Sequence, residues 1–266
     1  MLKKRVLTAL CLIPLILLLL FKSTPIFYAA VLIGLLMLAM NEWFALVPLV
    51  GQAKQLISLF LGTAGLMWIY LVPFDAILSA TSVCLWLYFA LCVCLYPKSQ
   101  GVWATRLFMT ISMFILIGGC FHALYSMRIS THGSAYILYL LCLIWGADTG
   151  AYFAGKCFGT TKLIPSVSPG KTVEGAMGAL CCVLIVATVG AYCLNIKLLA
   201  PWYLISLIVL AASIFGDLLI SMFKRRVGLK DTGTLLPGHG GLLDRIDSLL
   251  SASVFFYFSM NVFGLT

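Results

Sequence analysis

Charged side chains are scarce in this 266-residue sequence, and acidic ones are scarcer than basic ones. Only 9% of the residues are charged, with 8 Asp and Glu against 17 Lys and Arg. A soluble domain would carry charge on about a quarter of its residues. The scarcity therefore excludes an ordinary water-soluble globule. The basic surplus, a net charge of +9, suits an anionic membrane surface, although membrane topology alone would also produce it.

Histidine is also rare, and the three histidines lie far apart at His122, His132 and His239. No histidine-rich metal motif and no Ser–His–acid order is evident, so we do not propose hydrolysis by an activated nucleophile. The ten cysteines lie mostly inside apolar runs, where they are interpreted as small buried hydrophobic residues. This placement argues against a disulfide framework and against a zinc site.

Long apolar runs dominate the remainder of the chain, which is 63% hydrophobic with a mean hydropathy of +1.12. A helix needs about 20 mostly apolar residues to cross a bilayer. The runs are continuous rather than alternating, which argues against a transmembrane β-barrel. We therefore predict an all-α, polytopic integral membrane protein with about nine transmembrane helices. They cover about 5–21, 26–47, 56–73, 76–96, 104–124, 134–155, 175–194, 201–222 and 247–264.

The distribution of basic residues predicts the orientation of these nine helices. If the N-terminus is cytoplasmic, only Lys22, Arg128 and Lys197 of the 17 basic residues lie outside. The positive-inside rule therefore favours a cytoplasmic N-terminus and an external C-terminus. No small-residue cleavage site follows the first run, so we expect it to remain as a helix. The two longest polar loops, 156–174 and 223–246, then face the cytoplasm.

Acidic residues divide the chain into two regions. The first half of the chain, which spans the first five predicted helices and their connections, contains only Glu42 and Asp75, whereas the second part contains six acids. We therefore interpret residues 1–133 as an N-terminal helical scaffold that could serve dimerisation or lipid access. Residues 134–266 form the predicted catalytic transmembrane region with its cytoplasmic loops.

Three acids in the second region suit a metal site near the cytoplasmic surface. Asp217 lies inside an apolar run, where a carboxylate is costly unless it faces a cavity, a cation or a metal. Asp244 and Asp247 lie at the start of the last predicted helix. Hard oxygen ligands of this kind suit Mg²⁺, which binds one or two carboxylates together with water and phosphate oxygens. A structural ion pair at Asp217 and helix capping by Asp244 or Asp247 remain the alternatives.

Asp148 is a further acid inside an apolar run, with Tyr152 and Lys156 on its own helix face. A ligand role and a buried Asp–Lys pair are both open for it. Its neighbours form a small-residue face that permits close helix packing, made of Ala147, Ala151 and Ala154.

The loop at residues 162–175 combines proline, glycine and lysine. We expect a helix to begin there, with Ser168 as its N-cap and Pro169 at its first helical position. The free backbone N–H groups of that helix, together with Lys171, would then meet an anion. For the other lysines of the loop, the positive-inside rule is sufficient reason.

The segment 221–247 resembles the signature of the phosphatidate cytidylyltransferase, or CDP-diacylglycerol synthase, family. The pattern is Ser-x-hydrophobic-Lys-Arg, four residues, Lys-Asp-x-small, two residues, and hydrophobic-Pro-x-His-Gly-Gly-hydrophobic-x-Asp-Arg-hydrophobic-Asp. Every defined position is met. Segments 147–159 and 166–175 are similar to the same family. Gly170 departs from it, since many members have a basic or polar residue there.

The resemblance implies that CTP and phosphatidic acid react to give CDP-diacylglycerol and pyrophosphate. It also implies Mg²⁺ dependence, with room for a second cation such as K⁺, and a homodimer. The location implied is the inner (plasma) membrane, with the active site facing the cytoplasm. The partners expected are CTP, phosphatidic acid and the lipid bilayer, without nucleic acid.

Site residues follow from the acids, the basic residues and the resemblance together. The residues expected to take part in catalysis are Asp217, Asp244, Lys171, Lys224 and Arg225. Substrate contacts are expected from Ser168, Thr172, Ser221, Lys230, His239, Gly240, Gly241 and Arg245. The resemblance places the metal at Asp217 and Asp244, and the further metal candidates are Asp148, Glu174 and Asp247. No general base is required, because a phosphate monoester is already ionised at neutral pH.

Two other functions stay open at this point. A cytidylyltransferase for another lipid phosphate would show the same CTP and metal motifs. A cation-coupled transporter could use Asp148 and Asp217 as ion sites, but it would favour charge on both membrane faces. Here the polar residues gather on one face.

Overall fold

The structure, a computed structural model, describes residues 13–47, 54, 56–57, 60–62, 64–65, 75–233, 235 and 240–265. The all-α class is confirmed, with one short antiparallel hairpin added to it. The helices are α2 (Pro25–Leu46), α4 (Asp75–Cys94), α5 (Gln100–Trp103), α6 (Arg106–Ile129), α7 (Gly133–Phe158), α8 (Val173–Cys193), α9 (Leu199–Arg226) and α10 (Leu243–Val262). The strands are β1 (Lys162–Ile164) and β2 (Ser168–Thr172).

Six of the described helices are long and apolar enough to cross a membrane. They are Pro25–Leu46, Ala76–Cys94, Arg106–Ile129, Gly133–Phe158, Val173–Cys193 and Leu199–Arg226. The first predicted helix is helical over 13–21, where it is described, and most of the predicted helix 56–73 lies outside the described residues. The number nine therefore stays a prediction.

α10 is the predicted ninth membrane helix, and it is not among the six most apolar ones. It packs against α4, α6, α7 and α9 inside the bundle, where the hydroxyls of two of its serines find hydrogen-bond acceptors. Ser248 donates to the Ser213 carbonyl oxygen at 3.2 Å, and Ser251 donates to the Ala212 carbonyl oxygen at 2.7 Å. A helix surrounded by other helices can carry such polar groups, because they are satisfied inside the protein.

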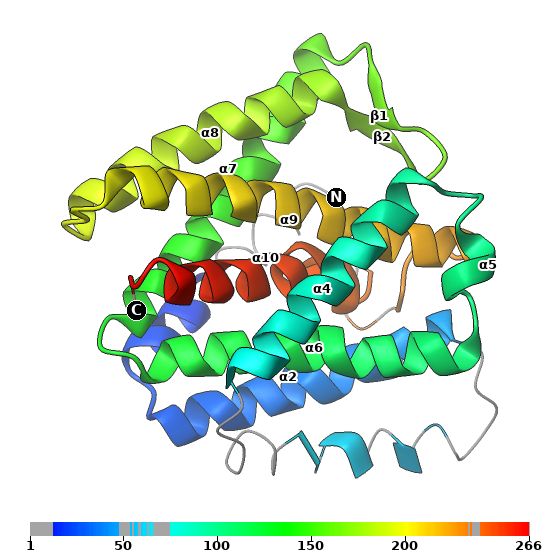
Figure 1. The fold of residues 1–266 in the computed structure, drawn as a ribbon, viewed down its shortest axis with the longest axis horizontal. Helices are drawn as coiled ribbons and strands as arrows, with labels where there is room; N and C mark the ends of the chain where they lie inside the picture. Colours follow the sequence, from blue (N-terminus) through cyan, green and yellow to red (C-terminus); the bar gives the residue numbers. More distant parts are fainter. Residues whose placement is uncertain are drawn as a thin grey trace.

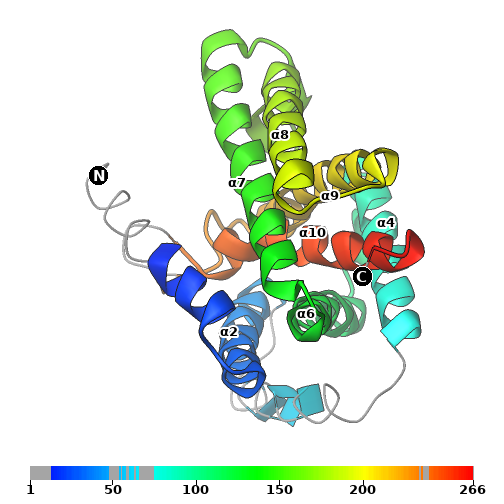
Figure 2. The ribbon, with the colours of Figure 1, turned by 90° about the vertical axis from the view of Figure 1, so that its left-hand side faces the viewer.

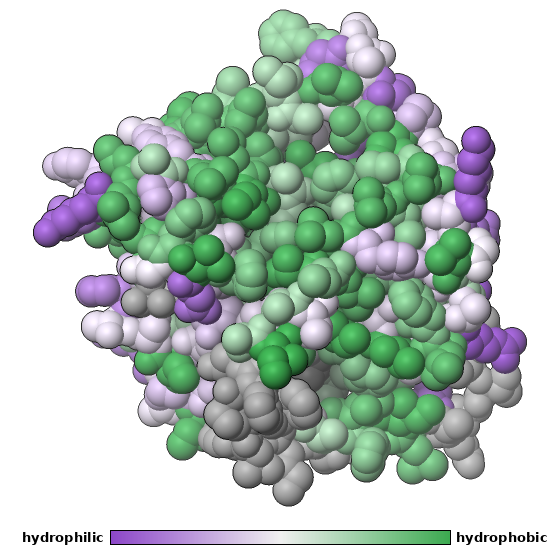
Figure 3. All heavy atoms as spheres, in the orientation of Figure 1, coloured by the Kyte–Doolittle hydropathy of each residue, from purple (hydrophilic) through white to green (hydrophobic). Residues whose placement is uncertain are grey.

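The helix ends gather on opposite sides of the molecule. The C-terminal ends of α4 and α9 lie on the right of Figure 1, together with α5 and the β-hairpin, and α7 ends at the top, just before the hairpin. Figure 2 shows α7 and α8 projecting as a pair beyond the other helices. Green, hydrophobic side chains cover the centre of the face in Figure 3, and purple, hydrophilic ones lie mainly along its edges. This distribution is the one expected of a protein embedded in a bilayer.

Helices α7 and α8 pack closely because glycines lie where they cross. A Cβ on Gly150 would lie 2.4 Å from the Gly178 carbonyl oxygen, and a Cβ on Gly178 would lie 2.3 Å from Ala154 Cβ. The close packing predicted from the alanines of this segment is therefore present. Backbones that approach so closely leave no room for larger side chains.

The helix start predicted at Ser168 is wrong. Residues 168–172 form strand β2, which pairs with β1, and α8 begins at Val173. Thr172 is the actual N-cap, because its backbone is extended and its side chain accepts a hydrogen bond from the Gly175 N–H at 3.1 Å. Pro169 is compatible with a strand of this kind, since a two-stranded sheet has only edge strands.

An aromatic cluster ties the N-terminal helices to the C-terminal end of α9. Phe223 of α9 contacts Trp43 of α2 and Phe89 of α4, each at a centroid distance of 5.4 Å. It also contacts Trp103 of α5, at 5.1 Å. All four side chains are buried, so the position of the last turn of α9 depends on three other helices.

Candidate active site

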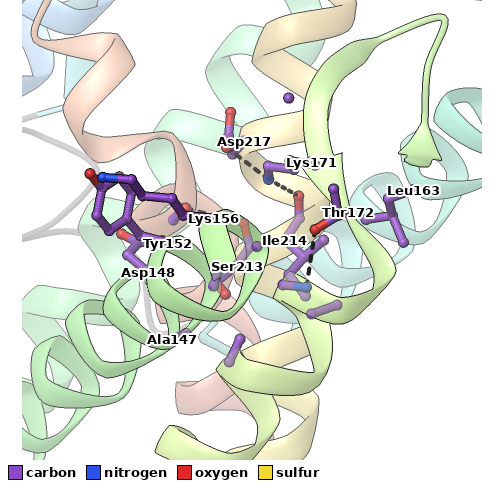
Figure 4. A pocket seen from close by; sticks show the side chains of 17 residues that line it. Ala147, Asp148, Tyr152, Lys156, Leu163, Lys171, Thr172, Ser213, Ile214 and Asp217 are labelled. Carbon is purple, nitrogen blue, oxygen red and sulfur yellow. Dashed lines mark hydrogen bonds and ion pairs between the residues drawn. The ribbon is translucent and has the colours of Figure 1, made fainter. Parts of the chain in front are cut away.

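A cavity of about 520 Å³ lies between α7, α8, α9 and the β-hairpin. One part of its wall is polar and the other is built from small apolar side chains (Figure 4). The polar or charged lining residues are Asp148, Tyr152, Lys156, Lys171, Thr172, Ser213, Asp217 and Ser248. The others are Ala147, Ala151, Gly155, Leu163, Gly170, Gly175, Ala176, Ala179 and Ile214.

An ion pair between β2 and α9 lies in this wall. Lys171 Nζ is 2.7 Å from Asp217 Oδ2 and 3.4 Å from the Ile214 carbonyl oxygen, as Figure 4 shows. Ser221, one helical turn beyond Asp217, donates to Asp217 Oδ1 at 3.2 Å. The four-residue spacing on α9 places Ser221 on the same helix face as Asp217. The pair remains partly accessible, with side chains 26% and 34% exposed, so it can meet a ligand.

Asp148 faces the same cavity from α7. Its carboxylate lies close enough to Lys171, Asp217 and Arg245 for their charges to interact. Lys156, the ion-pair partner that the sequence offers for Asp148, lies with Nζ 5.7 Å from the centroid of the Tyr152 ring. Lys156 and Tyr152 also line the cavity. One wall of the cavity therefore combines acidic residues with lysines.

A second ion pair joins the last turn of α9 to the first turn of α10. Lys224 Nζ donates to Asp244 Oδ1 at 2.7 Å, and the two side chains are only 13% and 6% exposed. Asp244 Oδ2 accepts from the Thr232 and Gly241 N–H groups at 2.8 and 3.2 Å. Burial alone would raise the pKa of Asp244, but these donors hold the pKa below its usual range.

Asp247 connects the two ion pairs. Its carboxylate interacts with the charges of Asp217, Lys171 and Lys224, and its Oδ1 accepts from the Ser248 N–H at 2.7 Å. Ser248 lines the cavity. The acids Asp148, Asp217 and Asp247 therefore belong to one electrostatic cluster, and the Lys224–Asp244 pair adjoins it.

The three consecutive basic residues at the end of α9 point to different partners. Lys224 binds Asp244, whereas Arg225 Nε donates to the Val167 carbonyl oxygen in the hairpin at 3.2 Å. Arg226 binds the Ala104 carbonyl oxygen and Met109 Sδ, and its guanidinium lies 5.7 Å from the centroid of the Trp103 ring. Lys224 is therefore the residue of this run that contacts a predicted site acid.

Several predicted substrate contacts lie outside the cavity wall. Ser168 lies in β2 but not in the lining, and Lys230 is exposed. Gly240 has φ +86, a left-handed backbone conformation that glycine adopts without strain. His239 lies outside the described residues. Arg245 is exposed but interacts with Asp148.

Glu174 occupies a different place from the other acids. Its carboxylate accepts from the Thr160 N–H and hydroxyl and from the Thr161 N–H, at 2.7–3.2 Å. These bonds fix the chain between α7 and β1. Glu174 is not among the lining residues of the cavity. Its contacts are therefore structural and local to this connection.

Glu42 is a residue that sequence reasoning missed. It lies near the end of α2, and its carboxylate accepts from the Leu242 and Leu243 N–H groups at 2.8 and 2.7 Å. These partners lie next to Asp244. The available signal was its rarity, because an acid inside an apolar run is costly without partners.

Mg²⁺ is implied by the sequence resemblance, and the donor set suits it. Asp148, Asp217 and Asp247 supply hard carboxylate oxygens within one cluster. Within the described ranges, no group of three or more His, Cys, Asp or Glu side chains is arranged to hold a metal ion. Mg²⁺ needs only one or two carboxylates when water and substrate phosphates complete its shell.

Comparisons with known proteins identify the family of the chain. A model of the cytidylyltransferase family matches residues 3–263. The chain is 37% identical to the phosphatidate cytidylyltransferase of Haemophilus influenzae, over 96% of this chain and 97% of that protein. It is 36% identical to that of Pseudomonas aeruginosa, over 95% and 94%. A third relative, from Bacillus subtilis, is 44% identical over 56% of each chain. The match includes the N-terminal helices as well as the motif-bearing half, and the chain belongs to the cytidylyltransferase family.

Proposed function

We propose that this chain is a phosphatidate cytidylyltransferase, which makes CDP-diacylglycerol and pyrophosphate from CTP and phosphatidic acid. A phosphate oxygen of phosphatidic acid attacks the α-phosphorus of CTP and forms a new P–O bond. The bond from the α-phosphorus to the bridging oxygen breaks, and pyrophosphate leaves with that electron pair. The overall match to relatives with this name supports the assignment.

The observation that carries the proposal is the mixed character of the cavity. Lys171, Asp217 and Asp148 line the same space as Ala151, Ala176 and other small apolar residues. A lipid phosphate is amphipathic in the same way, with an anionic head and an apolar body. The cavity, formed largely by membrane helices, suits a reaction between a bilayer lipid and a water-soluble nucleotide.

The charges of the site suit two anionic reactants. Phosphatidic acid and CTP repel each other, so the protein must supply positive charge and hold the reacting groups in line. Lys171 is already beside Asp217, and Lys224 is beside Asp244. A substrate phosphate can replace one carboxylate as the partner of each lysine. Arg225 and Arg245 are both exposed and can reach phosphate groups in solution.

We further propose that Mg²⁺ is held by Asp217 and Asp244, with Asp148 or Asp247 close by. When bound there, Mg²⁺ would neutralise phosphate charge and stabilise the leaving pyrophosphate. Binding at Asp244 would require the Lys224 ammonium to release Oδ1, because both carboxylate oxygens already accept hydrogen bonds. A second cation such as K⁺ belongs to this proposal on the resemblance alone.

The remaining features are proposed at the level of the whole protein. We propose nine transmembrane helices, a cytoplasmic N-terminus, and an active site that faces the cytoplasm from the inner membrane. The distribution of basic residues supports this orientation, with 3 of the 17 on the external side. A homodimer is proposed from the sequence resemblance. Mass measurement of the purified protein in detergent tests it.

Labelled CTP tests the reaction directly. Purified protein is mixed with phosphatidic acid, Mg²⁺ and CTP that is radiolabelled at either the α- or the γ-phosphate. We expect the α-label in the lipid fraction and the γ-label in pyrophosphate. Omission of Mg²⁺ should abolish both transfers. Label in an isoprenoid phosphate but not in phosphatidic acid would instead identify another lipid substrate.

A further inference from the structure

The Glu42 carboxylate caps α10 from a helix that lies 200 residues earlier in the chain. The first N–H groups of a helix have no partner within it. A serine, threonine, asparagine or aspartate at the N-cap usually supplies one, but the N-cap of α10 is Leu242, which makes no side-chain cap. Glu42 Oε1 and Oε2 accept from the Leu242 and Leu243 N–H groups instead, at 2.8 and 2.7 Å.

The surrounding loop is shaped to admit this carboxylate. A Cβ on Gly233 would lie 2.6 Å from Glu42 Oε1, and a Cβ on Gly241 would lie 2.5 Å from Glu42 Oε2. Real Cβ atoms do not approach oxygen so closely, so any larger residue at either position would displace the carboxylate or the loop. Part of the glycine content of this segment therefore makes room for Glu42.

Thr232 connects Glu42 to the site acid. Its hydroxyl donates to Glu42 Oε2 at 3.1 Å, and its N–H donates to Asp244 Oδ2 at 2.8 Å. Thr232 is only 4% exposed. Gly241, which packs against Glu42, donates its N–H to the same Asp244 oxygen. The two backbone N–H groups that donate to Asp244 therefore belong to residues that contact Glu42.

The end of α2 is anchored next to the other partner of Asp244. Trp43, which follows Glu42, is fully buried and packs on Phe223 with a centroid distance of 5.4 Å. Phe223 precedes Lys224, whose Nζ binds Asp244 Oδ1. Glu42 therefore contacts the residues that donate to Asp244 Oδ2, and Trp43 contacts the residue before Lys224, which donates to Asp244 Oδ1.

We propose that Glu42 is a positioning residue, which holds Thr232, Gly241 and the first turn of α10 in place and thereby orients Asp244 for Mg²⁺ and CTP phosphate. This inference rests on the proposed function. It assigns the N-terminal helices a direct part in the active site, beyond a scaffold. Outer contacts that orient a metal ligand are typically worth about 10–100-fold in metal affinity or activity.

The test uses the full-length protein with Glu42→Gln, which keeps the size of the side chain. The amide offers one oxygen and directs N–H groups toward the N–H donors of α10. We expect the Mg²⁺ concentration for half-maximal label transfer to rise at least about tenfold. Thr105→Ala is the matched control, because it also removes a side-chain helix cap, the one that Thr105 provides to the Phe108 N–H at the start of α6.

Kinetics separate positioning from a simple loss of folded protein. Misfolding lowers the amount of active enzyme and leaves the half-maximal Mg²⁺ concentration unchanged. A Glu42→Gln enzyme with the wild-type Mg²⁺ dependence would overturn the inference, whatever its yield. Thr232→Val removes only one of the bonds to Glu42, and we expect a smaller shift in the same direction.

Hydrogen exchange supplies a readout that does not depend on turnover. In Glu42→Gln, the single amide oxygen can replace only one of the two carboxylate oxygens that accept from Leu242 and Leu243. We expect the N–H group that loses its acceptor to exchange on the order of tenfold faster. The control Thr105→Ala should leave the exchange of both N–H groups unchanged. If wild-type protein transfers no label, the proposed function fails, and exchange alone then decides the role of Glu42. Unchanged exchange in Glu42→Gln would overturn it.

Discussion

At the scale of single residues, the Lys171–Asp217 ion pair links the β-hairpin to the membrane helices. Its nitrogen and oxygen are 2.7 Å apart in the cavity wall. We expect Lys171→Ala to lower kcat by about 10²–10³, the cost of removing one preorganised charge donor from a transition state. Asp217→Asn should lower it at least as much. Lys197→Ala, on the predicted external side, is the control, and label transfer within twofold of wild type in Lys171→Ala would refute the role.

Neighbouring basic residues at the end of α9 should respond differently to substitution. Arg226 lies over the Trp103 ring and binds the Ala104 carbonyl oxygen, so its contacts are structural. We expect Arg226→Ala to cost about 2 kcal/mol of stability, from the lost cation–π contact and hydrogen bond. Turnover per folded molecule should stay within about twofold, measured after thermal unfolding in detergent has quantified the folded fraction. A tenfold loss per folded molecule would place Arg226 in the site.

At the scale of elements, the α7–α8 pair carries most of one wall of the cavity, and its glycines set the separation. We expect Gly178→Leu to destabilise the protein by about 1–3 kcal/mol or more, the usual cost of overpacking. The reason is that a Cβ there already meets Ala154 Cβ at 2.3 Å. Thermal unfolding in detergent measures this loss of stability. The control is Gly118→Ala on α6, where nothing lies within 4 Å of the added Cβ; equal effects of the two changes would contradict the packing argument.

Elements also show where sequence reasoning was sufficient and where it failed. Apolar length predicted the long helices, because each needs only its own residues to satisfy its backbone. The segment around Ser168 and Pro169 has typical helix-start residues, yet it pairs with residues 162–164. Strand pairing depends on a partner elsewhere in the chain, and a local capping pattern contains no information about it.

At the scale of the whole molecule, the two regions predicted from the acids are connected through the site. The signature at 221–247 identified Asp244 and Lys224, which pair in the structure. It could not identify Glu42, because that contact spans 190–201 residues and only the folded chain brings α2 beside α10. The local motif was therefore readable from sequence, and its long-range support was not.

The transmembrane topology provides the last prediction. α10 has 20 residues, about 30 Å of helix, which matches the hydrocarbon core of a bilayer. Because buried serines lower its hydropathy, composition alone does not decide whether it crosses. We expect a reporter fused after Arg226 to be cytoplasmic and one fused after Thr266 to be external. Green fluorescent protein, which fluoresces only inside, and alkaline phosphatase, which is active only outside, measure the two positions. If both fusions are cytoplasmic, α10 does not cross and the nine-helix topology is wrong. If the Arg226 fusion is external, the Lys224–Asp244 site faces away from cytoplasmic CTP, and the proposed orientation fails.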